Sequence, residues 1–119
     1  MTNVNRENVQ AWVDALRSGE YDQAKEVLHT SDGSYCCLGV ACEISGLGDW
    51  DGEYYKIADE ERWSGVLPPA VQKWLGLGIR SSNPMLRGNT TAVTLNDDFD
   101  LTFAEIADLV EKKYLGVTR

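Results

Sequence analysis

The sequence predicts an α+β fold: a small single domain in which three to four helices pack with a small antiparallel sheet. Its 119 residues are enough chain for one domain, residues 1–119, with a modest core. Hydrophobic residues make up 43% of the chain and charged residues 25%, which is the balance of a globular protein rather than a disordered one. Apolar residues recur at helical spacing in several short segments, and two other stretches carry the pattern of strands.

The helices near the two ends are the most clearly marked. Asn5 is a suitable N-cap and Gly19 a suitable left-handed end for a first helix, whose buried stripe consists of Val9, Trp12, Val13 and Leu16. Thr102 and Glu105 have the spacing of a capping box, and an apolar face follows them. Lys112–Lys113 then lie at the end of this last helix, where positive charge interacts favourably with the helix dipole.

The segment SYCCLGVACEISG, residues 34–46, predicts a helix over residues 35–45. Ser34 is placed to accept a hydrogen bond from the first free backbone amides of this helix. Gly46 is the expected C-cap, and Gly39 falls where the backbone of another element can approach closely.

The remaining segments predict shorter elements. Residues 20–29 favour a second short helix, and residues 68–75 start with prolines and are followed by glycine, as a short helix often is. Strand patterns occur at Tyr54–Ile57 and at residues 91–95, where TAVTL alternates in polarity.

The three cysteines lie close together in the sequence and raise the question of a metal or catalytic site. Neighbouring residues on a helix point about 100° apart, and no C-x-x-C spacing occurs, so we expect no metal site from Cys36, Cys37, Cys42 and His29. A nucleophilic cysteine needs a histidine base, and the single histidine, His29, precedes all three. We therefore expect free, buried thiols that fill the core.

Charge is segregated along the chain. The formal net charge of −8 disfavours direct binding to nucleic acid or to an anionic membrane. Seven acids and one base lie between Glu43 and Glu61, and six acids and no base lie between Asp97 and Glu111. Residues 62–96, by contrast, carry four bases and no acid. This middle stretch is therefore the part expected to attract an anion.

The acid-free stretch supplies a candidate anion site. Its two later arginines carry guanidinium groups, which suit phosphate oxygens, and hydrogen-bond donors lie between them. Two aromatic side chains that precede them in sequence offer flat surfaces for a planar ligand. The chain has no glycine-rich phosphate fingerprint, and no cofactor is expected. The predicted ligand-binding residues are Arg80, Arg87, Ser82, Asn83, Trp63 and Tyr54.

Four segments in order carry a resemblance to a known family: WVDALRSGEYDQ, YCCLGVACE, LPPAVQKWLGL and LNDDFDLTFAEIADLVE. On these segments the chain resembles a family of small proteins encoded by bacteriophages and by bacteria that carry prophage genes. The likeness covers nearly the whole chain and departs from the family in the loop at residues 79–91. It implies a phage origin, and no catalytic activity or functional residue comes with it.

A phage origin leads to two non-enzymatic expectations. The first is an anti-defence protein that sequesters a small, anionic, nucleotide-derived signal, in a pocket shared between the subunits of a homo-oligomer. The second is an acidic inhibitor that binds a host defence protein as a DNA mimic, which predicts one continuous acidic face from residues 43–61 and the helix near Thr102. The segregation of charge favours the first.

An enzyme is the third alternative, acting through Cys36, through Cys37 or through the Asp97–Asp98 carboxylate pair. Because the chain shows neither a signal peptide nor an apolar run long enough to cross a bilayer, we expect it in the cytoplasm of the infected bacterial cell, away from membranes.

Overall fold

A computed structural model describes residues 4–58, 62–77 and 82–116. Within these ranges the protein has the predicted α+β fold, with five α-helices rather than three to four. The helices are α1 (Arg6–Arg17), α2 (Cys37–Ser45), α3 (Pro69–Leu75), α4 (Ala92–Asp97) and α5 (Phe103–Val110), and the π-helical turn η1 (Glu111–Leu115) continues α5. The strands are β1 (Asp22–Gln23), β2 (Ser34–Tyr35), β3 (Asp49–Asp51), β4 (Tyr54–Lys56), β5 (Arg62–Trp63), β6 (Met85–Arg87) and β7 (Thr90–Thr91).

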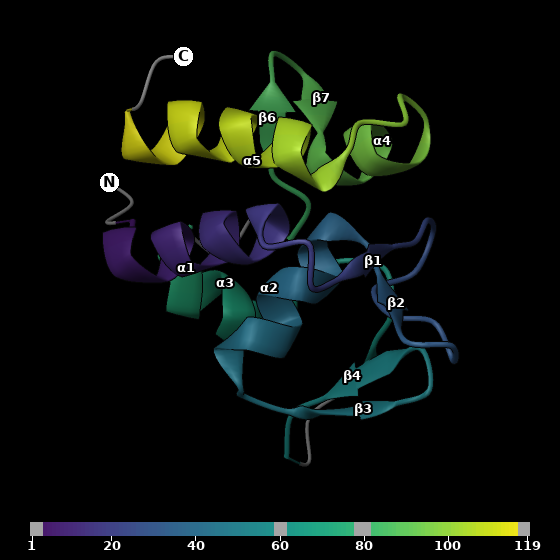
Figure 1. Cartoon of the computed structure of the whole chain (residues 1–119). Coiled ribbons are helices and arrows are strands. Elements are labelled where there is room, and N and C mark those ends of the chain that lie inside the picture. The colour runs from purple at the N-terminus through teal and green to yellow at the C-terminus, as the bar shows by residue number, and fades with distance from the viewer. Residues whose placement is uncertain (1–3, 59–61, 78–81, 117–119) are drawn as a thin grey trace.

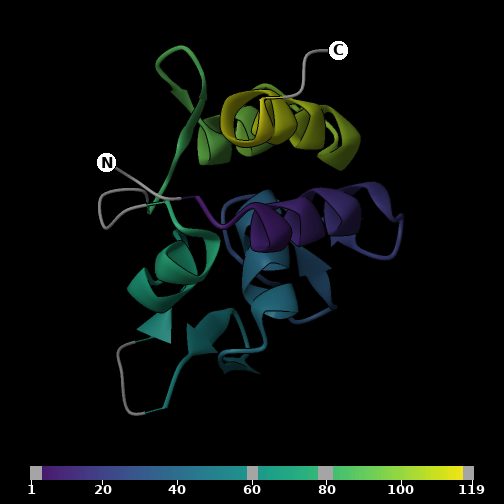
Figure 2. The same cartoon turned by 90° about the vertical axis from the view of Figure 1, so that its left-hand side faces the viewer.

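The elements lie in layers on either side of α1. Helices α4 and α5 and the β6–β7 hairpin lie above α1 in Figures 1 and 2, and α2 and α3 lie below it. The antiparallel sheet β3–β4–β5 forms the opposite end of the molecule. Helix α1 packs against α2, α3 and α5, so the core extends to both sides of it. At its centre Trp12 is fully buried, and its Nε1 donates a hydrogen bond to the Cys37 carbonyl at 2.9 Å.

Three helices form where the sequence predicts them. Asn5 caps α1 by accepting a hydrogen bond from the Asn8 amide, and the predicted stripe of α1 is buried. Thr102 and Glu105 form the predicted capping box of α5, and α3 begins directly after Pro68. The strand predicted at Tyr54–Ile57 is confirmed as β4. These elements are set by local signals, which explains why the sequence alone identifies them.

The predicted helix at residues 20–29 is wrong. This segment contains β1, which pairs in parallel with β2. Its backbone amides bond to distant carbonyls, since Ala24 donates to Tyr35 at 2.7 Å and Leu28 donates to Ser64 at 2.6 Å. Glu26 adopts a left-handed φ of 73°, which no right-handed helix allows. Tertiary hydrogen bonds therefore override the helical pattern of the segment.

Ser34 is not the N-cap of the cysteine-rich helix. It lies in β2, and α2 begins at Cys37 after the N-cap residue Cys36, whose thiol accepts a hydrogen bond from the Gly39 amide at 3.4 Å. Gly46 ends the helix in the left-handed region, as predicted. The helix starts two residues later than predicted because the backbone of residues 34–35 is used in pairing with β1.

The strand predicted at residues 91–95 is also wrong beyond its first residue. Thr91 ends β7 and caps α4, and its hydroxyl accepts a hydrogen bond from the Thr94 amide at 3.4 Å. Asn83 adds a second cap from outside the helix, because its Oδ1 accepts a hydrogen bond from the Val93 amide at 3.0 Å. Two caps at one helix start outweigh the strand preference of β-branched residues.

Across residues 4–58, 62–77 and 82–116, no helix is both long and apolar enough to cross a membrane.

Candidate functional site

An open hollow of about 460 Å³ lies between the β6–β7 hairpin and the C-terminal end of the α5–η1 helix. This volume is within the range of about 300–1,000 Å³ that is typical of small-molecule sites. Its floor is apolar and its rim carries three cationic side chains. The lining residues are Met85, Leu86, Arg87, Gly88, Leu109, Lys112 and Lys113. We call this space the cationic hollow.

Local structure explains how the cations reach the rim. Along β6, Leu86 is buried while Arg87 is exposed, because successive side chains of a strand point to opposite faces. The Arg87 guanidinium lies 5.5 Å from the centroid of the Phe99 ring, a cation–π contact that restricts its position. Lys112 and Lys113 come from the π-helical turn η1, and such turns frequently occur at functional sites. Lys113 also donates a hydrogen bond from Nζ to the carbonyl of Met85 in β6.

Some cations of the chain form ion pairs and others do not. Arg17, Lys25 and Arg62 each pair with a carboxylate, whereas other cations outside the hollow, among them Lys73, form no ion pair within the described residues. Among the described residues, no carboxylate pairs with Arg87, Lys112 or Lys113. The hollow is set apart because three cations without an ion pair line one space, in a chain of net charge −8.

A smaller hollow of about 250 Å³ adjoins the first and shares Arg87 and Leu109 with it. Its other lining residues are Leu101, Glu105 and Asp108, so its polar side chains apart from Arg87 are carboxylates. We call it the carboxylate hollow. Glu105 accepts a hydrogen bond from the Thr102 amide through Oε1 at 2.9 Å, and Asp108 pairs with Arg17 through Oδ1. Arg87 therefore lies on the boundary between a cationic space and an anionic one.

The structure brings only part of the predicted site together. Arg87 lines both hollows, whereas Arg80 lies outside the described residues. Ser82 and Asn83 have structural contacts, since the Ser82 carbonyl accepts a hydrogen bond from the Leu67 amide at 2.8 Å and Asn83 caps α4.

The two predicted aromatic residues belong to a different part of the molecule. Tyr54 lies in β4 and is exposed, and Trp63 lies in β5, where it pairs with Tyr55. The sheet that contains them is at the opposite end of the molecule from the β6–β7 hairpin (Figure 1). The aromatic ring beside Arg87 is instead that of Phe99, which is 54% exposed.

Sequence reasoning missed Lys112, Lys113 and Phe99 as members of a site. The helix dipole accounts for two lysines at a helix end but not for their position opposite β6. The local sequence points the other way, since Asp108 lies four residues before Lys112, a spacing that favours an ion pair on a helix, and the described structure contains no such pair. Nothing in the local sequence links Phe99 to Arg87, which lies twelve residues earlier.

The cysteines are free and buried, as predicted. Burial raises the pKa of Cys36 to about 11 and raises the pKa of Cys37 and Cys42 well above the usual value. A nucleophilic thiol requires the opposite shift. His29 is occupied elsewhere, because its Nδ1 lies 2.8 Å from the Gly52 carbonyl and its ring stacks on Trp50 with 4.6 Å between centroids.

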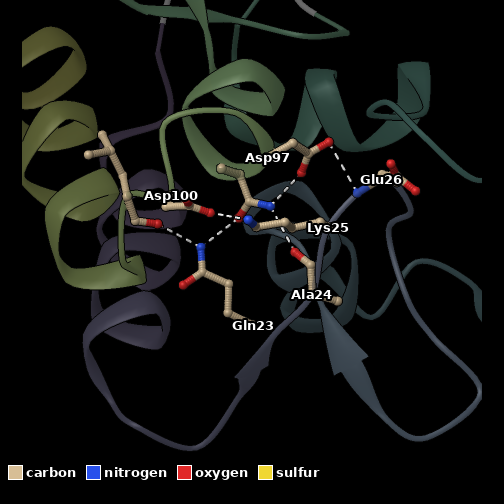
Figure 3. A network of polar contacts seen from close by, with 8 residues as sticks. Gln23, Ala24, Lys25, Glu26, Asp97 and Asp100 are labelled. Atoms are coloured by element: carbon tan, nitrogen blue, oxygen red, sulfur yellow. Dashed lines mark hydrogen bonds and ion pairs between the residues drawn. The ribbon is translucent and has the colours of Figure 1, made fainter.

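The Asp97–Asp98 pair lies beside a network of polar contacts that joins α4 to the segment before β2 (Figure 3). Asn96 is fully buried, and its amide nitrogen donates to the Ala24 carbonyl and to Asp97, both at 2.8 Å. Asp97 also accepts a hydrogen bond from the Glu26 amide at 3.1 Å. Through these hydrogen bonds Asp97 connects α4 to the backbone of residues 24–26.

In the described part of the chain, no group of three or more His, Cys, Asp or Glu is arranged to hold a metal ion.

The two acidic segments do not form one face in the described structure. The exposed acids Asp49, Asp51 and Glu53 lie in and around the β3–β4 hairpin. Helix α5 lies at the other end of the molecule, with α1 and α2 between them (Figures 1 and 2). Asp51 is moreover paired with Arg62 at 3.0 Å.

The protein is thus a small α+β domain with one hollow lined by three cations and an adjoining hollow lined by two carboxylates. The chain belongs to the family described as a domain of unknown function, DUF8296, whose model matches residues 4–114. No curated protein and no solved structure matches the chain.

Proposed function

We propose that this protein is a non-enzymatic binding protein of phage origin that sequesters a small, phosphate-bearing, nucleotide-derived signal in the cationic hollow. The observation that supports this proposal is the gathering of Arg87, Lys112 and Lys113 around one open space with no carboxylate partner among the described residues. Guanidinium and ammonium groups bind phosphate oxygens through charge-assisted hydrogen bonds, which are stronger than neutral ones. Arg87 supplies a planar fork and the lysines supply point charges.

Other features of the structure favour this function over the two alternatives, which are an acidic DNA mimic and an enzyme. A DNA-mimic inhibitor requires a continuous acidic face, and the described acidic segments lie at opposite ends of the molecule. A thiol enzyme requires an accessible thiolate, and the three thiols are buried with raised pKa values. A carboxylate enzyme would use Asp97, whose oxygens accept hydrogen bonds from Asn96 and from the Glu26 backbone.

Thermal unfolding of the full chain with a panel of anions tests the proposal. The panel contains inorganic pyrophosphate, ADP-ribose and cyclic dinucleotides. A ligand present at 100 times its dissociation constant stabilises the folded state by about 2.7 kcal/mol, which a melting curve resolves easily. Denaturing the complex and recovering the ligand intact then distinguishes sequestration from turnover.

Variants locate the binding site. We expect Arg87→Gln and Lys112→Gln each to weaken binding about tenfold, because each removes one charge-assisted contact from an exposed side chain without a carboxylate partner among the described residues. Lys73→Gln is the matched control, because Lys73 is exposed on α3 and lines neither hollow. A panel without any stabilising anion, or equal binding by all three variants, would contradict the proposal.

A further inference from the structure

The two hollows meet at Arg87 and carry opposite charge. The cationic hollow presents Lys112 and Lys113, and the carboxylate hollow presents Glu105 and Asp108. Leu109 lies in the floor of both, so the two spaces share an apolar surface. A ligand that spans them therefore meets cations at one end and hydrogen-bond acceptors at the other.

This arrangement is unsuited to a purely anionic ligand. A carboxylate is an acceptor only, so it repels a second anion and attracts N–H and O–H donors. Glu105 and Asp108 each use one carboxylate oxygen within the described residues, Glu105 for the Thr102 amide and Asp108 for Arg17. Their second oxygens, Glu105 Oε2 and Asp108 Oδ2, have no hydrogen-bond donor among those residues.

We infer that the ligand is a nucleoside phosphate that lies across Arg87, with its phosphate in the cationic hollow and its nucleoside in the carboxylate hollow. There the ribose hydroxyls or the N–H groups of the base donate to Glu105 and Asp108, while the flat side of the nucleoside packs on Leu101 and Leu109. This inference rests on the proposed function and adds a discrimination: the site selects nucleoside phosphates against inorganic phosphates.

The variant Glu105→Gln tests the inference with little risk to the fold. Glutamine at this position of a capping box still accepts a hydrogen bond from the Thr102 amide, so α5 keeps its cap. The substitution removes one negative charge and places a donor where the nucleoside needs an acceptor. Glu53→Gln is the matched control, since Glu53 is exposed in the turn between β3 and β4 and lines neither hollow.

The measurement is the dissociation constant of pyrophosphate and of GDP for each full-length variant, by calorimetry. We expect the unsubstituted protein to bind GDP about tenfold more tightly than pyrophosphate, the effect of one or two hydrogen bonds to a charged group. We expect Glu105→Gln to weaken GDP binding and to leave pyrophosphate binding unchanged or stronger, and Glu53→Gln to alter neither.

The outcomes separate this inference from the proposed function. Binding of neither probe contradicts the inference, and it contradicts the proposed function as well if no other anion of the panel binds. Binding of pyrophosphate as tightly as GDP, or parallel changes for both probes in Glu105→Gln, contradicts the inference alone, because charge by itself then explains the site. Two further ligands identify the donor: weaker binding of IDP assigns the guanine amino group, and weaker binding of 2′-deoxy-GDP assigns the ribose. If both bind as tightly as GDP, the donor is the N1–H of the base or the 3′-hydroxyl, which these ligands keep.

Discussion

The backbone of Gly39 in α2 lies directly against the carbonyl group of Leu28, and a Cβ on Gly39 would overlap the carbonyl oxygen. The same carbonyl accepts a hydrogen bond from the Cys36 amide at 3.2 Å, so it cannot move away without loss of that bond. The close approach that the sequence predicts at Gly39 is thus present and involves rigid backbone on both sides.

We expect Gly39→Ala to lower the free energy of unfolding by about 3 kcal/mol or more, because backbone that is packed this tightly relaxes only with strain. Urea unfolding measures the change. Gly65→Ala is the control, since a Cβ at Gly65 meets no atom within 4 Å. Similar stability for both variants would show that α2 moves freely relative to Leu28.

A second prediction concerns Asn96, the buried side chain that joins three segments. Its Oδ1 accepts hydrogen bonds from the Gln23 side chain at 2.8 Å and from the Cys37 amide at 3.3 Å, and its nitrogen donates to Ala24 and to Asp97. Asn96→Asp keeps the shape, removes both donors and places a second carboxylate beside Asp97. We expect a loss of about 2–4 kcal/mol in unfolding free energy, as for other broken buried networks.

Asp98→Asn is the control for this substitution, because Asp98 is exposed and follows the network in sequence. It should change stability by less than about 0.5 kcal/mol, as surface substitutions usually do. Equal effects at positions 96 and 98 would mean that the network does not stabilise the fold.

The parts of the fold that sequence predicts are those with local causes. Asn5 caps its own helix, and Thr102 and Glu105 cap each other, so a short window contains the whole explanation. Residues 20–29 do not form a helix because their hydrogen-bond partners, among them the Tyr35 carbonyl and Asn96, are remote in sequence. Hydrogen bonds to distant groups leave no periodic pattern to detect.

In the candidate site, too, the sequence predicts the residue with a local signal and misses those brought in from distant segments. The absence of acids from residues 62–96 identifies Arg87 as a base without a local partner, and the structure places it on the rim of a hollow. Its neighbours come from later segments of the chain: Lys112 from η1 and Phe99 from the loop before α5. Only the packing of β6 against α5 brings these three together.

Two serine substitutions test the structural interpretation of the cysteines. Serine at position 36 remains a good N-cap and can accept the hydrogen bond from the Gly39 amide, so Cys36→Ser should change stability by less than about 1 kcal/mol. Cys42 is fully buried within the core, and Cys42→Ser should cost about 1–3 kcal/mol if its hydroxyl finds no partner. Urea unfolding of both variants gives the comparison. A stable Cys36→Ser protein that no longer binds its ligand would assign the thiol a functional role.

Stability is expected to fall at alkaline pH. Burial raises the pKa of Cys36 to about 11 and the pKa values of Tyr35 and Tyr114 to about 12 in the folded protein. The unfolded chain therefore loses these protons first, near the usual values of about 9–10, and binds fewer protons than the folded state above them. The unfolding free energy should be constant up to about pH 9 and decrease from there towards pH 12.

Urea unfolding at several pH values between 8 and 11 measures this decrease. Cys36→Ser removes one of the groups, so its stability should decline less steeply between pH 9 and pH 11 than that of the unsubstituted protein. If the unfolding free energies of both proteins decrease equally with pH, Cys36 is not buried in solution.

Phe99 provides the last prediction, because its ring holds the Arg87 guanidinium at the boundary of the two hollows. The ring is exposed, so Phe99→Leu should lower the unfolding free energy by no more than about 0.5–1 kcal/mol, the contribution of an exposed cation–π contact. Anion affinity should fall by about two- to fivefold, because Arg87 then loses its fixed position. Phe99→Trp restores a face for the guanidinium and should restore affinity, which a role in folding alone would not explain. Full affinity in Phe99→Leu would show that Arg87 needs no support from the ring.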